Sequence, residues 1–414
     1  MKEIMILGAG TAGTIVANQL RRRMPSGWRL TVIDPEPQHL YQPGLLFVPF
    51  GLRGAGGIER RRERTLGGGI RWLQQQVEVV DLERRRVRLT KGEELRYDIL
   101  ILASGSQIRP EETAGLLGPH WHRTAHDFYT REGAAALGRA LDTMEEGRLV
   151  VNVVEMPIKC PVAPLEFLFL ADEHFTRRGI RDRIELVFAT PLDGAFTRPL
   201  ASRMLGSLLD EKGVRVEAEF NTGEVDGESR ILRSWDEREI EYDLLVTVPT
   251  HMGAPFIAES GLGDELAFIP TDPGTLLVKG QNDLFALGDA TNLQSSKAGS
   301  VAHFQSEVAA ENVLRLIAGR SPVDEFDGHS NCFIESGFGK AVLIDFNYDV
   351  EPLPGRYPYP LVGPLSLLKE TRVNHWAKLA SRWLYWNAIL PARPLPITNH
   401  MSMAGKHQPT AVAA

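Results

Sequence analysis

Short apolar runs that alternate with helical patterns organise the start of the chain. Residues 2–7 form one apolar run, residues 30–33 form another, and apolar positions recur at helical spacing from Ile15 to Met24. Between the first run and the helix lies the turn Gly8-Ala9-Gly10-Thr11-Ala12-Gly13. This order of strand, glycine turn, helix and strand predicts a β-α-β unit of a parallel sheet.

A second β-α-β unit is predicted in the middle of the chain, with strands at residues 148–154 and 184–190 around a helix at 163–178. The sequence thus indicates an α/β fold with two Rossmann-like dinucleotide-binding domains of the FAD/NAD(P)-binding type, followed by a C-terminal β-hairpin and an amphipathic helical segment. We expect a split first domain at 1–110 and 245–318, a second domain at 111–244, and a C-terminal region at 319–414.

The first glycine turn carries the features of a dinucleotide site. Gly8 permits the tight turn, Gly10 lets a pyrophosphate approach the backbone, and Gly13 lets helix and strand pack closely. Asp34 ends the second strand, where a carboxylate can accept hydrogen bonds from an adenosine ribose. The expected cofactor-binding residues here are Gly8, Gly10, Thr11, Ala12, Gly13 and Asp34.

Two later segments identify the cofactor. Ile99 to Ser106 and Asp283 to Thr291 are apolar runs that end in small-residue turns, and both resemble motifs of flavoproteins with two dinucleotide domains. That resemblance implies FAD contacts at Ala103, Gly288 and Asp289. The turn of the second unit, residues 155–164, has three prolines and no glycine, so a pyrophosphate could not approach its backbone closely. We therefore expect FAD and an electron donor other than NAD(P)H.

Charge and length limit the function further. The 414 residues carry a net charge of −7, so no global basic field indicates nucleic acid as a partner. Arginines cluster at 21–23, 60–64 and 84–88, and we interpret these clusters as solvated surface. Because the N-terminal MKEIMILGAG runs directly into a predicted strand and glycine turn, we expect no signal peptide. No run reaches the ~20 apolar residues of a spanning helix, so membrane contact is expected to be peripheral.

The two cysteines are too few for a disulfide scaffold and are candidate reactive sulfurs. Cys160 begins the predicted second-domain helix beside Lys159, and the helix dipole and the cation are both expected to favour its thiolate. Cys332 lies in a predicted strand that pairs with residues 341–346.

The chain resembles the family of sulfide:quinone oxidoreductases and flavocytochrome c sulfide dehydrogenases. The strings that carry the resemblance are GAGTAG at residues 8–13, HLYQPG at 39–44, Cys160 with Glu166 and Phe167, KAG at 297–299, and Cys332 before GFG. The resemblance implies that Cys160 and Cys332 face the flavin and pass sulfur, that Glu166 transfers protons, and that Lys297 and Gly299 lie by the flavin and quinone. It also makes Gln42 a cofactor-binding candidate.

Two departures from that family pattern bear on the mechanism. Residues 109–159 contain no cysteine, whereas many family members have one there, so we expect FAD to be bound non-covalently. A histidine that many members carry after the second-domain strand has no counterpart in TPLDGAFTR at residues 190–198. His126 is a candidate proton acceptor by chain position, and a surface histidine is an equally good interpretation.

The segment from Pro364 to Pro391 is aromatic, cationic and amphipathic. Its aromatic and aliphatic residues recur at helical spacing, and lysines and arginines lie among them. This composition favours an interfacial membrane helix, and the alternative is a structural cap on the flavin domain or on a subunit interface. The apolar residues of this pattern are Trp376, Leu379, Trp383, Trp386 and Leu390. Candidates for a quinone pocket are Gly299, Phe346, Trp383 and Tyr385, with Lys378 near the flavin.

These features together predict a peripheral membrane enzyme that oxidises sulfide to zero-valent sulfur or polysulfide and passes electrons through FAD to membrane quinone. A homo-oligomer is expected. The alternatives are an NADH:quinone oxidoreductase of the same fold and a flavin sensor that binds a protein partner without turnover.

Overall fold

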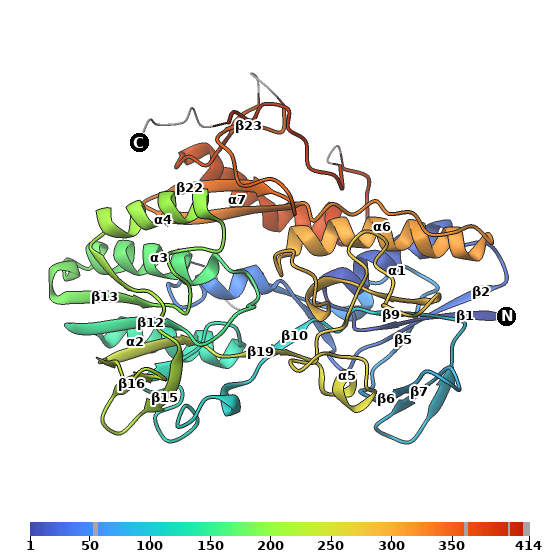
Figure 1. Cartoon of the computed structure of the whole chain (residues 1–414), viewed down its shortest axis with the longest axis horizontal. Coiled ribbons are helices and arrows are strands. Elements are labelled where there is room, and N and C mark those ends of the chain that lie inside the picture. The colour runs from blue at the N-terminus through green and yellow to red at the C-terminus, as the bar shows by residue number, and fades with distance from the viewer. Residues whose placement is uncertain (53–56, 360–362, 396–397, 409–414) are drawn as a thin grey trace.

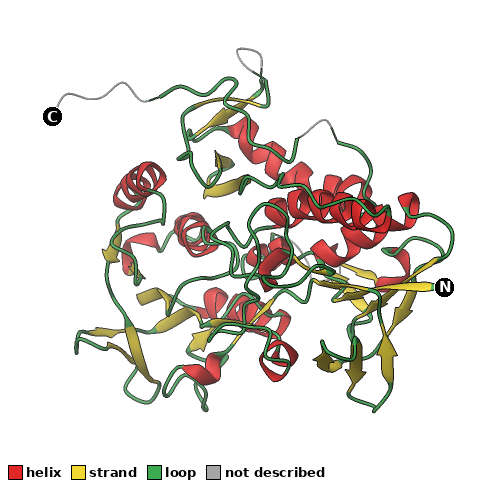
Figure 2. Ribbon diagram, turned by 45° about the vertical axis from the view of Figure 1, so that its right-hand side comes forward, coloured by secondary structure: helices red, strands yellow, loops and turns green. Residues whose placement is uncertain are grey.

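Two sheets, each of five parallel strands, form the frame of the molecule (Figure 1). The structure is a computed structural model that describes residues 1–52, 57–359, 363–395 and 398–408. Figure 2, turned by 45°, shows strands at both sides of the molecule with helices packed along them. The predicted α/β fold with two Rossmann-like domains is confirmed.

The first sheet has the strand order β20-β9-β1-β2-β5, so strands from the start of the chain lie beside one from residue 284 onward. Its inner strands are apolar throughout because both faces are covered. Helices α1 and α6 pack on one face, and α5 with a small antiparallel sheet covers the other. The elements are β1 (Lys2–Leu7), α1 (Thr11–Arg23), β2 (Trp28–Ile33), β5 (Arg71–Leu73), β6 (Val77–Asp81), β7 (Arg86–Leu89), β8 (Glu94–Arg96), β9 (Ile99–Leu102), α5 (Pro255–Glu259), β20 (Leu284–Ala286), η6 (Gly288–Ala290) and α6 (Gly299–Ile317).

The second sheet has the order β11-β18-β12-β13-β14. The proposed domain boundary at 244/245 coincides with the start of β18, whose residues pair with β12 from Leu244 to Val248. The elements are η4 (Pro110–Glu112), β11 (Ala125–His126), α2 (Arg131–Thr143), β12 (Gly147–Val153), α3 (Ala163–Arg177), η5 (Arg181–Arg183), β13 (Ile184–Ala189), α4 (Pro199–Glu211), β14 (Val214–Glu217), β15 (Thr222–Asp226), β16 (Ile231–Ser234), β17 (Glu239–Glu241) and β18 (Leu244–Val248). Two segments that pass between the domains, β10 (Ser106–Ile108) and β19 (His251–Gly253), pair antiparallel.

The C-terminal region lies across both domains, with β22 and α7 at the top of Figure 1. The predicted hairpin is present as β21 (Ser330–Gly337) and β22 (Lys340–Phe346), joined by β23 (Gly355–Tyr357) and β24 (Leu365–Leu367) in one sheet. Helix α7 (Arg372–Leu384) continues into the π-helical turn η7 (Tyr385–Ile389). Within the described ranges, no helix is both long and apolar enough to span a bilayer. Short elements beside α1 complete the fold: β3 (Gln38–Leu40), η1 (Gln42–Phe47), β4 (Glu59–Arg61) and η3 (Arg62–Arg64).

Candidate functional site

The glycine turn before α1 has the shape that a dinucleotide requires. Gly8 has a φ of +99°, and a Cβ there would lie 2.4 Å from the carbonyl oxygen of Ala103. A Cβ at Gly13 would lie 2.0 Å from the carbonyl oxygen of Gly8, whereas one at Gly10 would meet nothing within 4 Å. The turn is therefore packed on its inner side and open where a pyrophosphate would approach the start of α1.

Asp34, at the end of β2, is held in place by two neighbours. Its carboxylate accepts a hydrogen bond of 2.6 Å from the Ala9 amide and forms a 3.0 Å ion pair with Arg62. Arg62 is buried, and this burial lowers the pKa of its guanidinium while Asp34 raises it. The interpretation of 60–64 as uniformly solvated surface is therefore wrong at Arg62.

The segment between β20 and α6 supplies the second half of the flavin site. Gly288 adopts a φ of +70° and donates its amide to Gln305 at 2.6 Å. The ammonium of Lys297 donates to the carbonyl oxygens of Asp289 and Thr291, and burial lowers the pKa of Lys297 to about 8. Gly299 begins α6 with no neighbour within 4 Å of a built Cβ. These residues fit FAD, because the amino-terminal ends of α1 and α6 carry partial positive charge and begin at glycine backbone that is open to a ligand.

Cys160 lies where the second domain meets this segment. It has a positive φ of 50°, its amide donates to the Lys297 carbonyl oxygen at 2.7 Å, and its own carbonyl oxygen accepts from Ala163 at 2.8 Å. The glycine-free turn between β12 and α3 thus presents a cysteine, two residues before the cap of α3, next to the flavin segment.

Cys332 reaches the same place from β21. The neighbouring Asn331 carbonyl oxygen accepts a 2.7 Å hydrogen bond from Ser300, in the first turn of α6. Both cysteines are partly buried and unpaired. A charge on Cys332 would raise the pKa of Cys160, which shows that the two sulfurs lie within electrostatic reach of one another.

The expectation that Cys160 is a stabilised thiolate is wrong for the resting chain. Burial raises the pKa of Cys160 to about 12 and that of Cys332 to about 11. Lys378, rather than the adjacent Lys159, is the cation that opposes this shift at Cys160. Lys159 is itself partly buried, and desolvation lowers its pKa.

A chain of polar groups leads from the cysteines towards α7. Lys378 on α7 forms an ion pair with Glu166 on α3 and donates to the Phe333 carbonyl oxygen at 2.9 Å. Glu166 is 2% exposed and also accepts the Glu335 amide at 2.7 Å. The sequence indicated Lys378 and Glu166 separately, and the structure brings them together.

His375 and Glu335 were missed by the sequence reasoning. The His375 ring nitrogen Nδ1 lies 2.6 Å from the carboxylate of Glu335, which is buried beside Glu166. The only sequence signal was that His375 precedes Lys378 by three positions, which places both on one side of a helix.

His126 is not part of this cluster and is not a surface residue. It lies in β11, where its side chain is 1% exposed and its Nε2 is 2.9 Å from the Arg123 carbonyl oxygen. The groups that act on its pKa, which burial lowers, all belong to the second domain. Gln42 lies at the start of η1 and is exposed.

The quinone candidates lie on different elements and differ in exposure. Phe346 is buried in β22 under the guanidinium of Arg198, at 5.2 Å. Trp383 is 68% exposed on α7. Tyr385 is buried, and its hydroxyl lies 2.8 Å from that of Thr11 and 2.6 Å from the Nε2 of His39. Tyr385 therefore contacts the glycine turn of the flavin domain.

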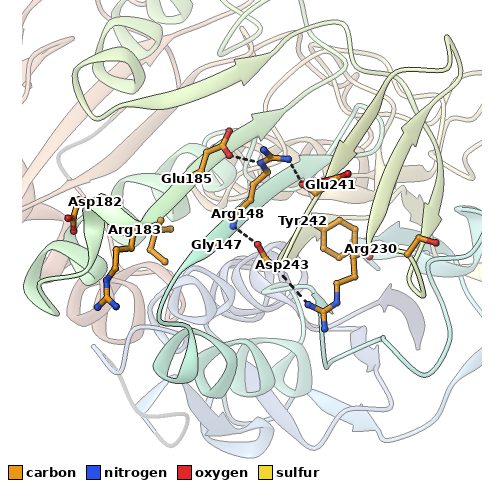
Figure 3. A pocket seen from close by; sticks show the side chains of 11 residues that line it. Gly147, Arg148, Asp182, Arg183, Glu185, Arg230, Glu241, Tyr242 and Asp243 are labelled. Atoms are coloured by element: carbon orange, nitrogen blue, oxygen red, sulfur yellow. Dashed lines mark hydrogen bonds and ion pairs between the residues drawn. The ribbon is translucent and has the colours of Figure 1, made fainter.

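A polar hollow of about 600 Å³ in the second domain lies apart from this site (Figure 3). Gly147 and Arg148, at the amino end of β12, line it, whereas Cys160 follows the carboxyl end of the same strand. Two ion pairs lie within the hollow: Arg148 with Glu185 at 2.6 Å and Arg230 with Asp243 at 3.9 Å.

The sequence is similar to those of known proteins. The model of the pyridine nucleotide-disulphide oxidoreductase family matches residues 2–151. The mitochondrial sulfide:quinone oxidoreductase of Mus musculus is 25% identical over 396 residues, which are 94% of this chain and 86% of that protein.

Two solved structures share the fold across most of the chain. The sulfide:quinone oxidoreductase of Aquifex aeolicus superposes with a TM-score of 0.77 at 17% identity, covering 94% of this chain and 92% of its own. A chain of the mitochondrial ATP synthase of Tetrahymena thermophila gives 0.78 at 18% identity, covering 96% and 98%. The same fold thus occurs both in a sulfide:quinone oxidoreductase and in a chain of an ATP synthase, so the fold by itself does not identify the function. The chain described here is an FAD-dependent oxidoreductase with the fold of the pyridine nucleotide-disulphide oxidoreductases, and it resembles sulfide:quinone oxidoreductases over nearly its whole length.

Proposed function

We propose that this chain is a sulfide:quinone oxidoreductase that acts at a membrane surface. The observation that carries the proposal is the placement of Cys160. It occupies the turn where a relative that uses NAD(P)H would have its second glycine motif, and it is hydrogen-bonded to the flavin segment at Lys297. Cys332 comes to the same point from β21.

The proposed reaction balances as one hydrosulfide, one quinone and one proton giving zero-valent sulfur and one quinol. In the oxidised enzyme, hydrosulfide attacks a disulfide or polysulfide bridge between Cys160 and Cys332, so one S–S bond breaks while another forms. Bound FAD supplies the two-electron acceptor chemistry that connects sulfur to quinone. Sulfur leaves as a zero-valent atom or as part of a polysulfide.

Lys378 and Glu166 are suited to handle charge and protons in that reaction. A cysteine that becomes a leaving group develops negative charge in a buried place, and Lys378 is the cation that favours its ionised form. Glu166, paired with Lys378, provides a carboxylate for proton transfer within the same contact.

An NADH:quinone oxidoreductase is the enzymatic alternative. The turn at residues 155–164 argues against it, because Cys160 with its positive φ replaces open glycine backbone. A non-catalytic flavin sensor is the third possibility, and it would give no role to two cysteines that both lie near the flavin segment.

The acceptor is proposed to be membrane quinone because α7 presents an unusual surface. Trp376 and Trp383 are 63% and 68% exposed, with Leu379 between them and Arg382 beside them. Tryptophan with cations on one exposed helix face is typical of the bilayer interface.

Steady-state quinone reduction tests the proposal. Purified protein with sulfide and a short-tail quinone should turn over, while Cys160→Ser and Cys332→Ser should each lose at least about 100-fold in kcat. Both variants should keep FAD, because the cradle at Gly8 to Gly13 is separate from the sulfurs. Parental turnover in either variant would remove that cysteine from the reaction.

FAD is proposed to be held without a covalent bond. Acid or heat denaturation should release the yellow cofactor into the supernatant, where its absorbance can be measured. Flavin that stays with the precipitated chain would contradict this.

A further inference from the structure

A second hollow lies between α1 and the C-terminal segment. It has a volume of about 440 Å³, and four arginines from two chain regions converge on it beside Trp386 and Leu390. The arginines are Arg21, Arg22, Arg60 and Arg64. They belong to clusters that sequence reasoning assigned to plain solvated surface. We refer to this hollow as the arginine pocket.

The positive charge of the arginine pocket is not neutralised by the protein. Among the residues that the structure describes, no aspartate or glutamate lines the pocket, and none of its four arginines forms an ion pair. Neighbouring arginines outside it do: Arg23 pairs with Glu311, and Arg62 with Asp34.

Three of the pocket arginines contact neutral groups of the protein. Arg21 donates to the Gly68 carbonyl oxygen at 2.8 Å, Arg22 donates to that of Ala392 at 2.6 Å, and Arg60 lies 4.6 Å above the Trp386 ring. Four gathered guanidinium groups repel one another, and an anion with several acceptor oxygens would relieve that repulsion.

We propose that the arginine pocket binds the phosphate of an anionic phospholipid headgroup. The pocket wall argues for a lipid: Trp386 and Leu390 form it, and they directly continue α7, whose exposed Trp383 lies three residues before Trp386. A phosphate held there would place the acyl chains beside the exposed tryptophans, which favour the same interface. The inference rests on the proposed action at a membrane and adds a specific lipid site to it.

The pocket is separate from the flavin site. Arg21 and Arg22 belong to the last turn of α1, whereas a pyrophosphate would meet the first turn at Gly10 and Thr11. The FAD phosphates therefore do not account for the charge.

Vesicle sedimentation of the holoenzyme tests this proposal. Phosphatidylcholine vesicles would be compared with vesicles that contain about 30 mol% phosphatidylglycerol. The variant is Arg21→Gln with Arg64→Gln, because Arg22 and Arg60 also hold the C-terminal segment. The matched control is Arg84→Gln with Arg139→Gln, which removes the same charge from exposed positions elsewhere.

We expect the pocket variant to lose roughly 20-fold in affinity for anionic vesicles and little for neutral ones, since each arginine at a charged surface contributes about fivefold. The control pair should lose clearly less. Equal losses of vesicle affinity in the pocket variant and the control variant would show that overall charge, and not a specific pocket, drives binding. A pocket variant that loses calorimetric binding of inorganic phosphate but keeps its anionic vesicle affinity would overturn the lipid assignment.

Flavin reduction by sulfide without vesicles separates this inference from the proposed function. The pocket variant should be reduced at the parental rate, because neither arginine touches the cysteines. If the parent itself were not reduced, the proposed function would fail, while the vesicle result would stand or fall on its own.

Discussion

At the scale of single residues, burial raises the pKa of both cysteines, which favours their thiol form whenever the pair is reduced. The pKa of Cys160 is raised to about 12 because its surroundings solvate a thiolate poorly. The stronger nucleophile at neutral pH is therefore hydrosulfide from solution. We propose that the positive charge of Lys378 stabilises the thiolate when Cys160 becomes the leaving group.

The raised pKa predicts the pH dependence of alkylation. In reduced Cys332→Ser protein, which keeps the burial of Cys160 but lacks the charge on Cys332, iodoacetamide should modify Cys160 at least about tenfold more slowly at pH 7 than a thiol of ordinary pKa, since the thiolate fraction falls tenfold for each unit by which the pKa is raised. The rate should keep rising about tenfold per pH unit through pH 10. A plateau near pH 8, measured against glutathione, would show that Cys160 is an activated thiolate.

Tyr385 separates a structural role from a quinone-binding role. Tyr385→Phe removes the hydroxyl between Thr11 and His39 and leaves the buried Nε2 of His39 without that partner. We expect a loss of about 1–3 kcal/mol in the free energy of unfolding and faster loss of FAD. The KM for quinone should not change. A raised quinone KM with unchanged Tm would restore Tyr385 to the quinone site.

At the scale of elements, α7 is both an exposed face and a cap. Its exposed side carries Trp376, Leu379 and Trp383, but the turn η7 changes the helical register, and Trp386 and Leu390 become buried. The sequence pattern placed all five on one apolar stripe, because a 3.6-residue period cannot reveal a π-helical turn. The interfacial and structural interpretations therefore each describe a part of the segment.

This division predicts opposite results for tryptophans of the same segment. Trp376→Gln with Trp383→Gln should weaken vesicle binding by at least about tenfold and leave Tm unchanged, because both side chains are solvent-exposed. Trp386→Gln should lower the free energy of unfolding by about 2–4 kcal/mol. The result that would refute the interfacial role is unchanged sedimentation with vesicles in the double variant.

Element positions were predictable where local pattern decides them. Both β-α-β units and the hairpin at residues 330–346 follow from apolar period and glycine placement. The contacts between elements did not follow, because they join residues far apart in the chain: Tyr385 meets His39 across 346 positions, and Lys378 meets Glu166 across 212. A repeating pattern along the chain carries no information about such distant pairs. Sequence reasoning could therefore name candidate residues of the site but not the residues that they contact.

At the scale of the whole molecule, the site exists only where three parts meet. The flavin segment supplies Lys297, the second domain supplies Cys160, and the C-terminal region supplies Cys332 and Lys378. This arrangement places the sulfurs between the flavin cradle and the helix that is proposed to face the membrane.

Anaerobic titration of the purified flavoprotein tests the central claim most directly. Stepwise addition of sulfide, followed by flavin absorbance, should bleach the oxidised band at about one sulfide per flavin, or two if a second sulfide accepts the sulfur. NADH added in the same way should leave the band intact, because the second domain lacks a glycine turn for it. Bleaching by NADH with none by sulfide would contradict the account.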